Sequence, residues 1–219
     1  HGLSGKRSRR NKQEVRYVRR RGILVLALAI VIAVSLGTSA MAGSIYAGND
    51  RSPGYGVRAD ISTPASAPWV GFSGQSSWVS TPGPTYWVQA GWRYYNGYSY
   101  AMSYYEYSLP TGYHLEEMSA QVWNFTRNYE VSYIGSSLWT VKVNGTPKGY
   151  WGYLSAPVYP VKARSESHYP TVELNTQFNN VQYRGTSTWF NFDQHNWIAQ
   201  SPYWLSVSST SRYRTQGPW

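Results

Sequence analysis

Apolar and polar residues alternate in short runs along most of this chain, and turn residues separate the runs. A period of two residues is typical of a half-buried strand, and no run has the longer period of an amphipathic helix. Gly, Pro, Asn and Ser lie between the runs, where strand pairing tolerates them. The predicted strands cover residues 57–62, 76–80, 86–94, 98–109, 117–125, 129–134, 138–143, 149–154, 171–178, 186–192 and 204–209. Many short strands predict an all-β sandwich or barrel.

One turn is specified by its residues. The run at 138–143 alternates throughout, and Asn144-Gly145 follows it directly. Asn-Gly suits the two-residue turns that join antiparallel strands. We therefore predict a hairpin at this point.

The first 42 residues have the pattern of an export signal. Residues 23–36 form a run of 14 that is apolar except for Ser35, with arginines at 19–21 before it and Ser-Ala-Met-Ala at 39–42 after it. A basic segment, an apolar segment and a small-residue cleavage site describe a secretory signal peptide. We expect cleavage after Ala42, as in an exported bacterial protein; the alternative is a retained anchor helix that fixes the protein to the cell surface.

The remaining chain divides into two parts by composition. Residues 43–56 are small, polar and interrupted by Gly and Pro, which predicts a flexible arm. Residues 57–219 are expected to form a single β-sandwich domain. Cysteine is absent, so the domain must rely on packing, for which its many Trp and Tyr residues are suited.

The net charge of +10 does not indicate a nucleic-acid partner. Nine of the 20 Lys and Arg residues lie between residues 6 and 21, whereas the chain after residue 42 has 11 basic and 9 acidic residues, a net charge of +2. A nucleic-acid-binding domain needs a basic surface within the fold. We therefore predict no nucleic acid, and a membrane only through the N-terminal segment.

The familiar catalytic motifs are missing. There is no G-x-S-x-G, P-loop or H-E-x-x-H sequence, and the absence of Cys excludes thiol catalysis and zinc ribbons. His114, His168 and His195 are far apart and do not have metal-ligand spacing. We predict neither a metal nor another cofactor.

Two predicted strands carry polar side chains on one face. In residues 87–93, alternation puts Trp87 and Gln89 on one face and apolar residues on the other. In residues 171–178, Glu173 likewise shares a polar face opposite an apolar one. On a concave sheet such polar faces would form a binding groove. The same alternation also occurs in any half-exposed sheet that has no binding function.

Five short segments add a resemblance to a known family. They are residues 55–64, 76–79 (Ser-Ser-Trp-Val), 87–91 (Trp-Val-Gln-Ala-Gly), 104–107 (Tyr-Tyr-Glu-Tyr) and 172–174 (Val-Glu-Leu). Their order and spacing resemble the eqolisins (peptidase G1, the glutamic endopeptidases). That family has a concanavalin-like sandwich of two antiparallel sheets, and the resemblance implies the same fold here.

The resemblance also implies a peptidase site. It implies that Gln89 and Glu173 are a catalytic dyad, although Leu174 stands where the family has Trp. In the family the glutamate is the general base for a water molecule and the glutamine stabilises the oxyanion. The residues expected to bind substrate are Trp78, Trp87, Tyr105 and Glu106. The implied partner is an extended polypeptide, cleaved at acidic pH.

Two other functions remain open at this point. Trp and Tyr stack on sugar rings, so a non-catalytic carbohydrate-binding module with a glycan partner fits the composition. A cell-surface or filament-forming protein fits as well, with the arm at 43–56 adding a strand to another copy by self-association. Convergence of Gln89 and Glu173 on one water molecule would favour the hydrolase.

Overall fold

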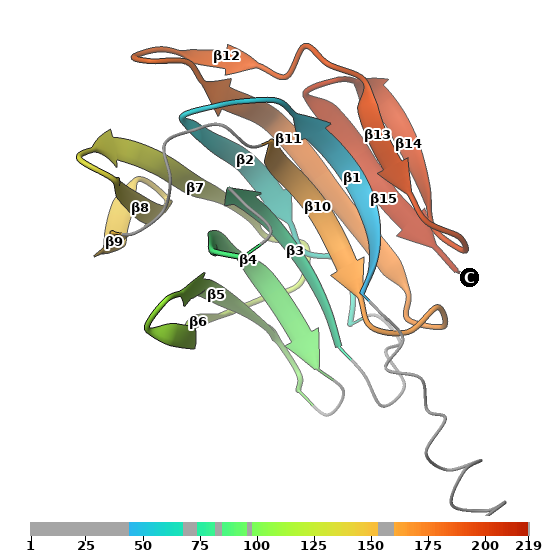
Figure 1. The fold of residues 1–219 in the computed structure, drawn as a ribbon. Helices are drawn as coiled ribbons and strands as arrows, with labels where there is room; N and C mark the ends of the chain where they lie inside the picture. The colour runs from blue at the N-terminus through green and yellow to red at the C-terminus, as the bar shows by residue number, and fades with distance from the viewer. Residues whose placement is uncertain (1–43, 68–73, 82–84, 96–97, 153–159, 219) are drawn as a thin grey trace, which may run out of the picture. The chain divides into compact units, whose positions relative to one another are not determined.

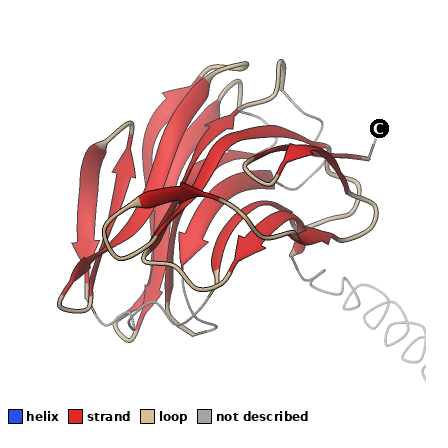
Figure 2. Cartoon of the chain, turned by 90° about the horizontal axis from the view of Figure 1, so that it is seen from above, coloured by secondary structure: helices blue, strands red, loops and turns tan. Residues whose placement is uncertain are grey.

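The computed structural model describes residues 44–67, 74–81, 85–95, 98–152 and 160–218. Within these ranges the chain forms strands joined by loops and turns, without a helix (Figures 1 and 2). The strands are β1 (Ile45–Arg51), β2 (Gly56–Ser62), β3 (Gly74–Thr81), β4 (Trp87–Tyr95), β5 (Ala101–Leu109), β6 (Gly112–Gln121), β7 (Thr126–Gly135), β8 (Leu138–Val143), β9 (Thr146–Trp151), β10 (Val161–Ser167), β11 (Leu174–Arg184), β12 (Trp189–Asn191), β13 (Asn196–Ala199), β14 (Trp204–Ser209) and β15 (Arg212–Gly217).

The expected leader, residues 1–42, lies outside the described residues. Within the described part of the chain there is no helix with the length and apolarity needed to cross a membrane.

The strands form two antiparallel sheets. Sheet A has the order β13-β1-β10-β3-β4-β5-β6, and sheet B has the order β14-β15-β11-β2-β7-β8-β9, with β12 paired to β11. Both sheets contribute to one buried core, in which Trp92 of sheet A and Trp139 and Phe178 of sheet B are fully buried. The prediction of an all-β sandwich is confirmed.

Buried tyrosines connect the two sheets by hydrogen bonds as well as by packing. The Tyr213 hydroxyl of β15 donates to the Ala163 carbonyl of β10 at 2.6 Å. The Tyr129 hydroxyl of β7 lies 2.9 Å from Oε1 of Gln121 at the end of β6. A buried hydroxyl without a partner costs free energy, so these bonds allow tyrosine rings to pack in the core beside its aliphatic residues.

The predicted hairpin is confirmed. It joins β8 to β9, and Asn144 and Gly145 have φ angles of 49° and 77°. Positive φ at both central residues defines the type I′ turn, whose twist matches that of the flanking strands.

The segment expected to be a flexible arm contains a strand instead. β1 pairs with β10 along its whole length and with β13 on its other side. Gly48 shows why the sequence is misleading, because a Cβ there would lie 2.3 Å from the Ala163 carbonyl oxygen. Small residues, typical of loops, are needed here for close packing. A strand already paired on both sides is not available to another copy.

Several strands were not predicted at their true positions. β10, β13 and β15 were missed, and the strand expected at 117–125 is divided between the end of β6 and the turn that precedes β7. In β10, Lys162, Arg164 and Glu166 alternate with buried small residues. Charged residues lower the strand propensity of a segment, and tertiary pairing overrides it here.

Candidate active site

The outer face of sheet A, which points away from the core, carries the polar residues predicted for β4. Val88, Ala90 and Trp92 are buried in the core, as alternation predicted. Gln89 therefore points to the outer face, where it is directly opposite Glu106 of β5 in the strand register. Two residues predicted from different segments meet on one face.

Gln89 and Glu106 form the centre of a hydrogen-bond network. The Gln89 side-chain amide donates to Oε1 of Glu106, and it also lies 3.2 Å from the Tyr104 hydroxyl. The Tyr113 hydroxyl of β6 donates to Oε2 of Glu106. Both carboxylate oxygens are thus held by named donors, which fixes the orientation of the group before any ligand binds.

The environment of Glu106 favours its neutral form. Burial raises the pKa of Glu106 above its ordinary value of 4.5, and the negative charge of Glu166 adds to the effect. The hydrogen bonds from Tyr113 and Gln89 and the charge of Arg93 oppose the rise in pKa without cancelling it. Burial and the bond to Glu106 also raise the pKa of Tyr113, so its hydroxyl stays protonated. A carboxyl group with a raised pKa is suited to general acid–base chemistry.

We expect the free energy of unfolding to depend on pH through Glu106. Between pH 4.5 and the higher pKa of the folded state, the folded chain keeps the Glu106 proton and the unfolded chain has lost it. Stability therefore falls as the pH rises through this interval. Glu106→Gln removes the contribution, so urea unfolding from about pH 4 to pH 7 should show the variant gaining stability relative to wild type. A difference between the two proteins that is constant with pH would contradict this.

Aromatic and charged side chains surround the carboxyl group on the same face. Trp87 lies next to Gln89 in β4, with its ring centroid 6.3 Å from that of Tyr113. Tyr113 itself is 61% exposed, so a ligand can reach the site from this side. Trp78 of β3 is buried, and its indole N–H donates to Glu166 of β10 at 3.0 Å.

Two predicted site residues lie elsewhere. Tyr105 points to the inner face of β5, where its ring centroid is 5.1 Å from that of Trp151 in sheet B. Glu173 directly precedes β11 of sheet B, between the buried residues Val172 and Leu174. Glu173 is half-buried, and the strand that follows it belongs to the sheet that does not contain Gln89. The expected convergence of Gln89 and Glu173 is corrected: the carboxylate that meets Gln89 is Glu106.

Sequence reasoning missed Tyr113 completely. It follows the two-residue connection between β5 and β6, in which Leu109 pairs with Gly112 and Ser108 pairs with Tyr113. Pro110 and Gly112 were a turn signal at this position. A hairpin with its turn at this position pairs Tyr113 with Ser108, which is two residues from Glu106 and on the same face of the strand.

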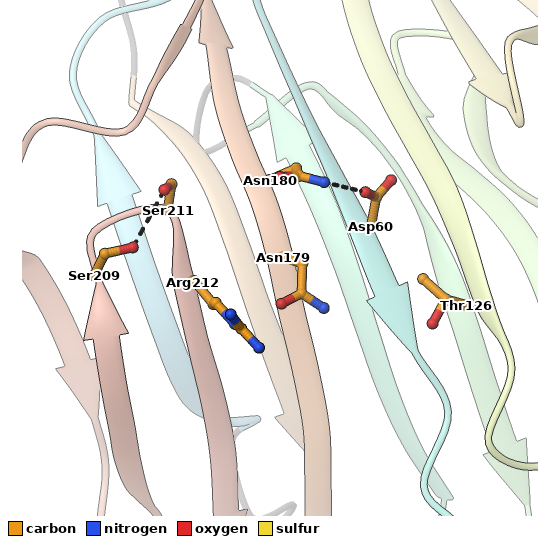
Figure 3. A pocket seen from close by; sticks show the side chains of 7 residues that line it. All are labelled: Asp60, Thr126, Asn179, Asn180, Ser209, Ser211 and Arg212. Atoms are coloured by element: carbon orange, nitrogen blue, oxygen red, sulfur yellow. Dashed lines mark hydrogen bonds between the residues drawn. The ribbon is translucent and has the colours of Figure 1, made fainter.

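Sheet B carries a separate polar pocket of about 520 Å³ (Figure 3). Its lining residues are Asp60, Thr126, Asn179, Asn180, Ser209, Ser211 and Arg212. Asp60 is the only carboxylate among these seven, and it accepts hydrogen bonds from the amides of Asn128 and Asn180. This lining offers no second acid or base. Among the described residues, no group of three or more His, Asp or Glu side chains is placed to hold a metal ion.

Comparison with known proteins identifies the fold. The sequence matches no protein-family model and no curated protein. The structure is similar to that of scytalido-glutamic peptidase with a peptide-based transition-state analogue, with a TM-score of 0.63 and 12% identity over 80% of this chain and 98% of that chain. It is also similar to SCP-B, a member of the eqolisin family of peptidases in complex with the tripeptide Ala-Ile-His, with a TM-score of 0.58, 12% identity and the same coverage. The chain therefore has the two-sheet sandwich fold of the eqolisin peptidases.

Proposed function

We propose that the protein is an exported endopeptidase of the glutamic type, with Glu106 and Gln89 as its catalytic pair. One observation carries the proposal: a glutamine amide and a carboxyl group of raised pKa are hydrogen-bonded to each other on one face of sheet A. The eqolisin peptidase structures align with 80% of this chain, and this shared fold supports peptide hydrolysis as the reaction.

The two side chains have complementary roles in peptide hydrolysis. The Glu106 carboxylate takes a proton from a water molecule, whose oxygen attacks the scissile carbonyl carbon. The same carboxyl group then gives the proton to the leaving amine as the C–N bond breaks. The Gln89 amide, which donates to Glu106 in the absence of substrate, donates to the oxyanion that develops on the carbonyl oxygen.

Trp87 and Tyr113 would bind the substrate beside this pair. Their ring centroids lie 6.3 Å apart, and both residues belong to the row of the sheet next to the Gln89–Glu106 row. Aromatic rings bury a large area and pack against apolar side chains of an extended peptide. Trp78 is buried and its indole N–H donates to Glu166. We therefore propose that Trp78 positions its neighbours and does not contact the substrate.

The proposal is tested by cleavage of an unstructured protein substrate by the purified protein at about pH 2 to 7. We expect Gln89→Ala to lower kcat by about 10²- to 10³-fold, as loss of an oxyanion donor does in other enzymes. Glu173→Gln is the matched control, because it changes a glutamate on the other sheet, and it should leave the rate unchanged. Absence of cleavage by the folded wild type across this range would contradict the proposal.

A glycan-binding function is the second candidate, favoured by exposed rings near the same site. Tyr95, Tyr98 and Tyr100 lie at the connection of β4 to β5 with 38%, 46% and 36% of their surface exposed. Exposed rings of this kind can stack on sugars. Binding of oligosaccharides, in a protein that cleaves no peptide, would support this function instead.

A further inference from the structure

The β1–β10 side of the same outer face holds two cations, Arg164 and Lys162, and two carboxylates, Asp50 and Glu166. Arg164 of β10 donates from Nε to Oδ1 of Asp50 at 2.8 Å, and its Nη2 donates to Oδ2. The side chains of this ion pair are only 11% and 14% exposed. Both oxygens of Asp50 are therefore used by a single guanidinium group.

Lys162 is the second cation. It is half-buried and lies directly opposite Asp50 in the register of β1 and β10. Among the described residues no carboxylate lies within ion-pair distance of its ammonium group. Burial lowers the pKa of Lys162, and the charge of Arg164 lowers it further while Asp50 partly opposes the shift. A partly desolvated ammonium group without a carboxylate at ion-pair distance is stabilised when an external anion binds to it.

The strand register connects Lys162 to the proposed catalytic pair. Lys162 pairs with Ser80, Ser80 with Gln89, and Gln89 with Glu106, so the side chains form one row across sheet A. Three strand spacings separate Lys162 from Glu106, or about 14 Å between their Cα atoms. An extended peptide advances about 3.3 Å per residue, so about four residues cover this distance.

The nearest acidic residue of the face along β10 does not cancel this charge. Glu166 is four residues beyond Lys162 on the same strand, about 13 Å away along the chain, and its carboxylate accepts the Trp78 indole N–H. The face therefore has a positive end at Lys162 and a negative end at Glu166. A ligand with a carboxylate matches the Lys162 end.

We propose that Lys162 binds a carboxylate of the peptide that occupies the Gln89–Glu106 site. The carboxylate comes either from an acidic side chain about three or four residues from the reacting bond or from the C-terminus of the peptide. The inference rests on the proposed function in one respect, that the ligand of this face is a peptide. It specifies a preference that neither the fold nor the catalytic pair requires.

Binding to a variant that cannot cleave tests the inference separately from catalysis. The probes are alanine-based octapeptides with one Glu or one Gln at successive positions, each with a free or an amidated C-terminus. Their affinity is measured by calorimetry with full-length Glu106→Gln protein at about pH 6, where peptide carboxylates are ionised. We expect one carboxylate to increase affinity about tenfold over its neutral counterpart, as charged hydrogen bonds do.

Three further substitutions assign the preference to Lys162. In the Glu106→Gln background, Lys162→Met should abolish the preference for the carboxylate, and Lys162→Arg should keep most of it. Lys148→Met, which removes an exposed cation from β9 of sheet B, should leave it unchanged. The position of the preferred Glu, or a preference confined to the free C-terminus, identifies the source of the carboxylate.

Two results would overturn the inference: equal affinity for charged and neutral peptides, including no binding of either, or a preference that survives Lys162→Met. Cleavage by the wild type without any charge preference would reject the role of Lys162 and leave the peptidase proposal in place. Carboxylate-dependent binding by a protein whose wild type cleaves no peptide would support the role of Lys162 and reject the peptidase proposal.

Discussion

Glu106→Gln is expected to lower kcat/KM for peptide cleavage by about 10²- to 10⁴-fold, the range in which general acid–base catalysis contributes. The amide has nearly the same size, and its carbonyl oxygen accepts the hydrogen bond from Gln89 while its NH2 group donates to the Tyr113 hydroxyl, but it cannot take up a proton from water. The loss should therefore appear mainly in kcat, because the residues that contact the substrate are retained. Steady-state kinetics on a fluorogenic peptide derived from a cleaved sequence measures both parameters.

Glu117→Gln is the matched control for this prediction. Glu117 lies on β6 on the same face of sheet A, where it forms an ion pair with Arg93, and its side chain is 35% exposed. The Arg93 side chain of this pair is 15% exposed, and no described hydrogen bond joins Glu117 to Gln89 or Glu106. Its replacement should change kcat/KM less than about twofold. Equal losses in the two variants would mean that cleavage depends on the charge of the face rather than on Glu106.

The pH profile provides a second test of the same residue. The base must be ionised to accept a proton, so cleavage should be lost as the pH falls through the pKa of Glu106. Because burial raises that pKa, the acidic limb should lie above 4.5, the ordinary value for glutamate. Tyr113→Phe removes a hydrogen bond that lowers this pKa, and it should move the limb to still higher pH. An unchanged limb in Tyr113→Phe would argue against Glu106 as the titrating group.

The sequence predicted the faces of the central strands well, because alternation is a local property. In β4 it separated Gln89 from Val88 and Ala90, and the structure confirms that division. It placed Glu106 in the site as a substrate-binding residue. It could not decide which carboxylate meets Gln89, because that depends on which strands are neighbours and on their register.

Sheet membership explains the misplaced Glu173, and alternation along one strand explains the misplaced Tyr105. Glu173 was chosen through a resemblance of three residues, and its strand belongs to the other sheet. Tyr105 was chosen together with Glu106, although neighbouring residues of a strand face opposite sides. Applying the period of two to residues 104–107 would have paired Glu106 with Tyr104 and directed Tyr105 to the core, as the structure shows.

Strands built from small or charged residues were the part of the fold that local pattern could not predict. β1 needs Gly48 for contact with β10, and β10 carries the ionic residues of the outer face. These two strands pair with each other along their full length, and each has a second partner, β13 for β1 and β3 for β10. The ion pair of Asp50 and Arg164 joins the side chains of β1 and β10. Its contribution to the free energy of unfolding can be tested by substitution.

Asp50→Asn is expected to lower the free energy of unfolding by about 3 kcal/mol, the lower end of the range for breaking a buried ion pair from one side. The substitution leaves the buried Arg164 guanidinium without a carboxylate and removes the negative charge nearest to Lys162. Asp193→Asn is the control, because the ion pair of Arg51 and Asp193 has one partner that is 56% exposed. Its loss should cost less than about 1 kcal/mol in the same urea titrations at neutral pH.

A double variant separates the two cations. In wild type, Lys162→Met removes both the repulsion from Arg164 and the attraction to Asp50, and these two effects oppose each other. In the Asp50→Asn background only the repulsion remains, so Lys162→Met should recover part of the lost stability. The double-mutant cycle measures this coupling directly, since the residues are in direct register across β1 and β10. A coupling energy of zero would show that Asp50 acts on Arg164 alone. It would also contradict the electrostatic interaction between Asp50 and Lys162 on which the proposed carboxylate site depends.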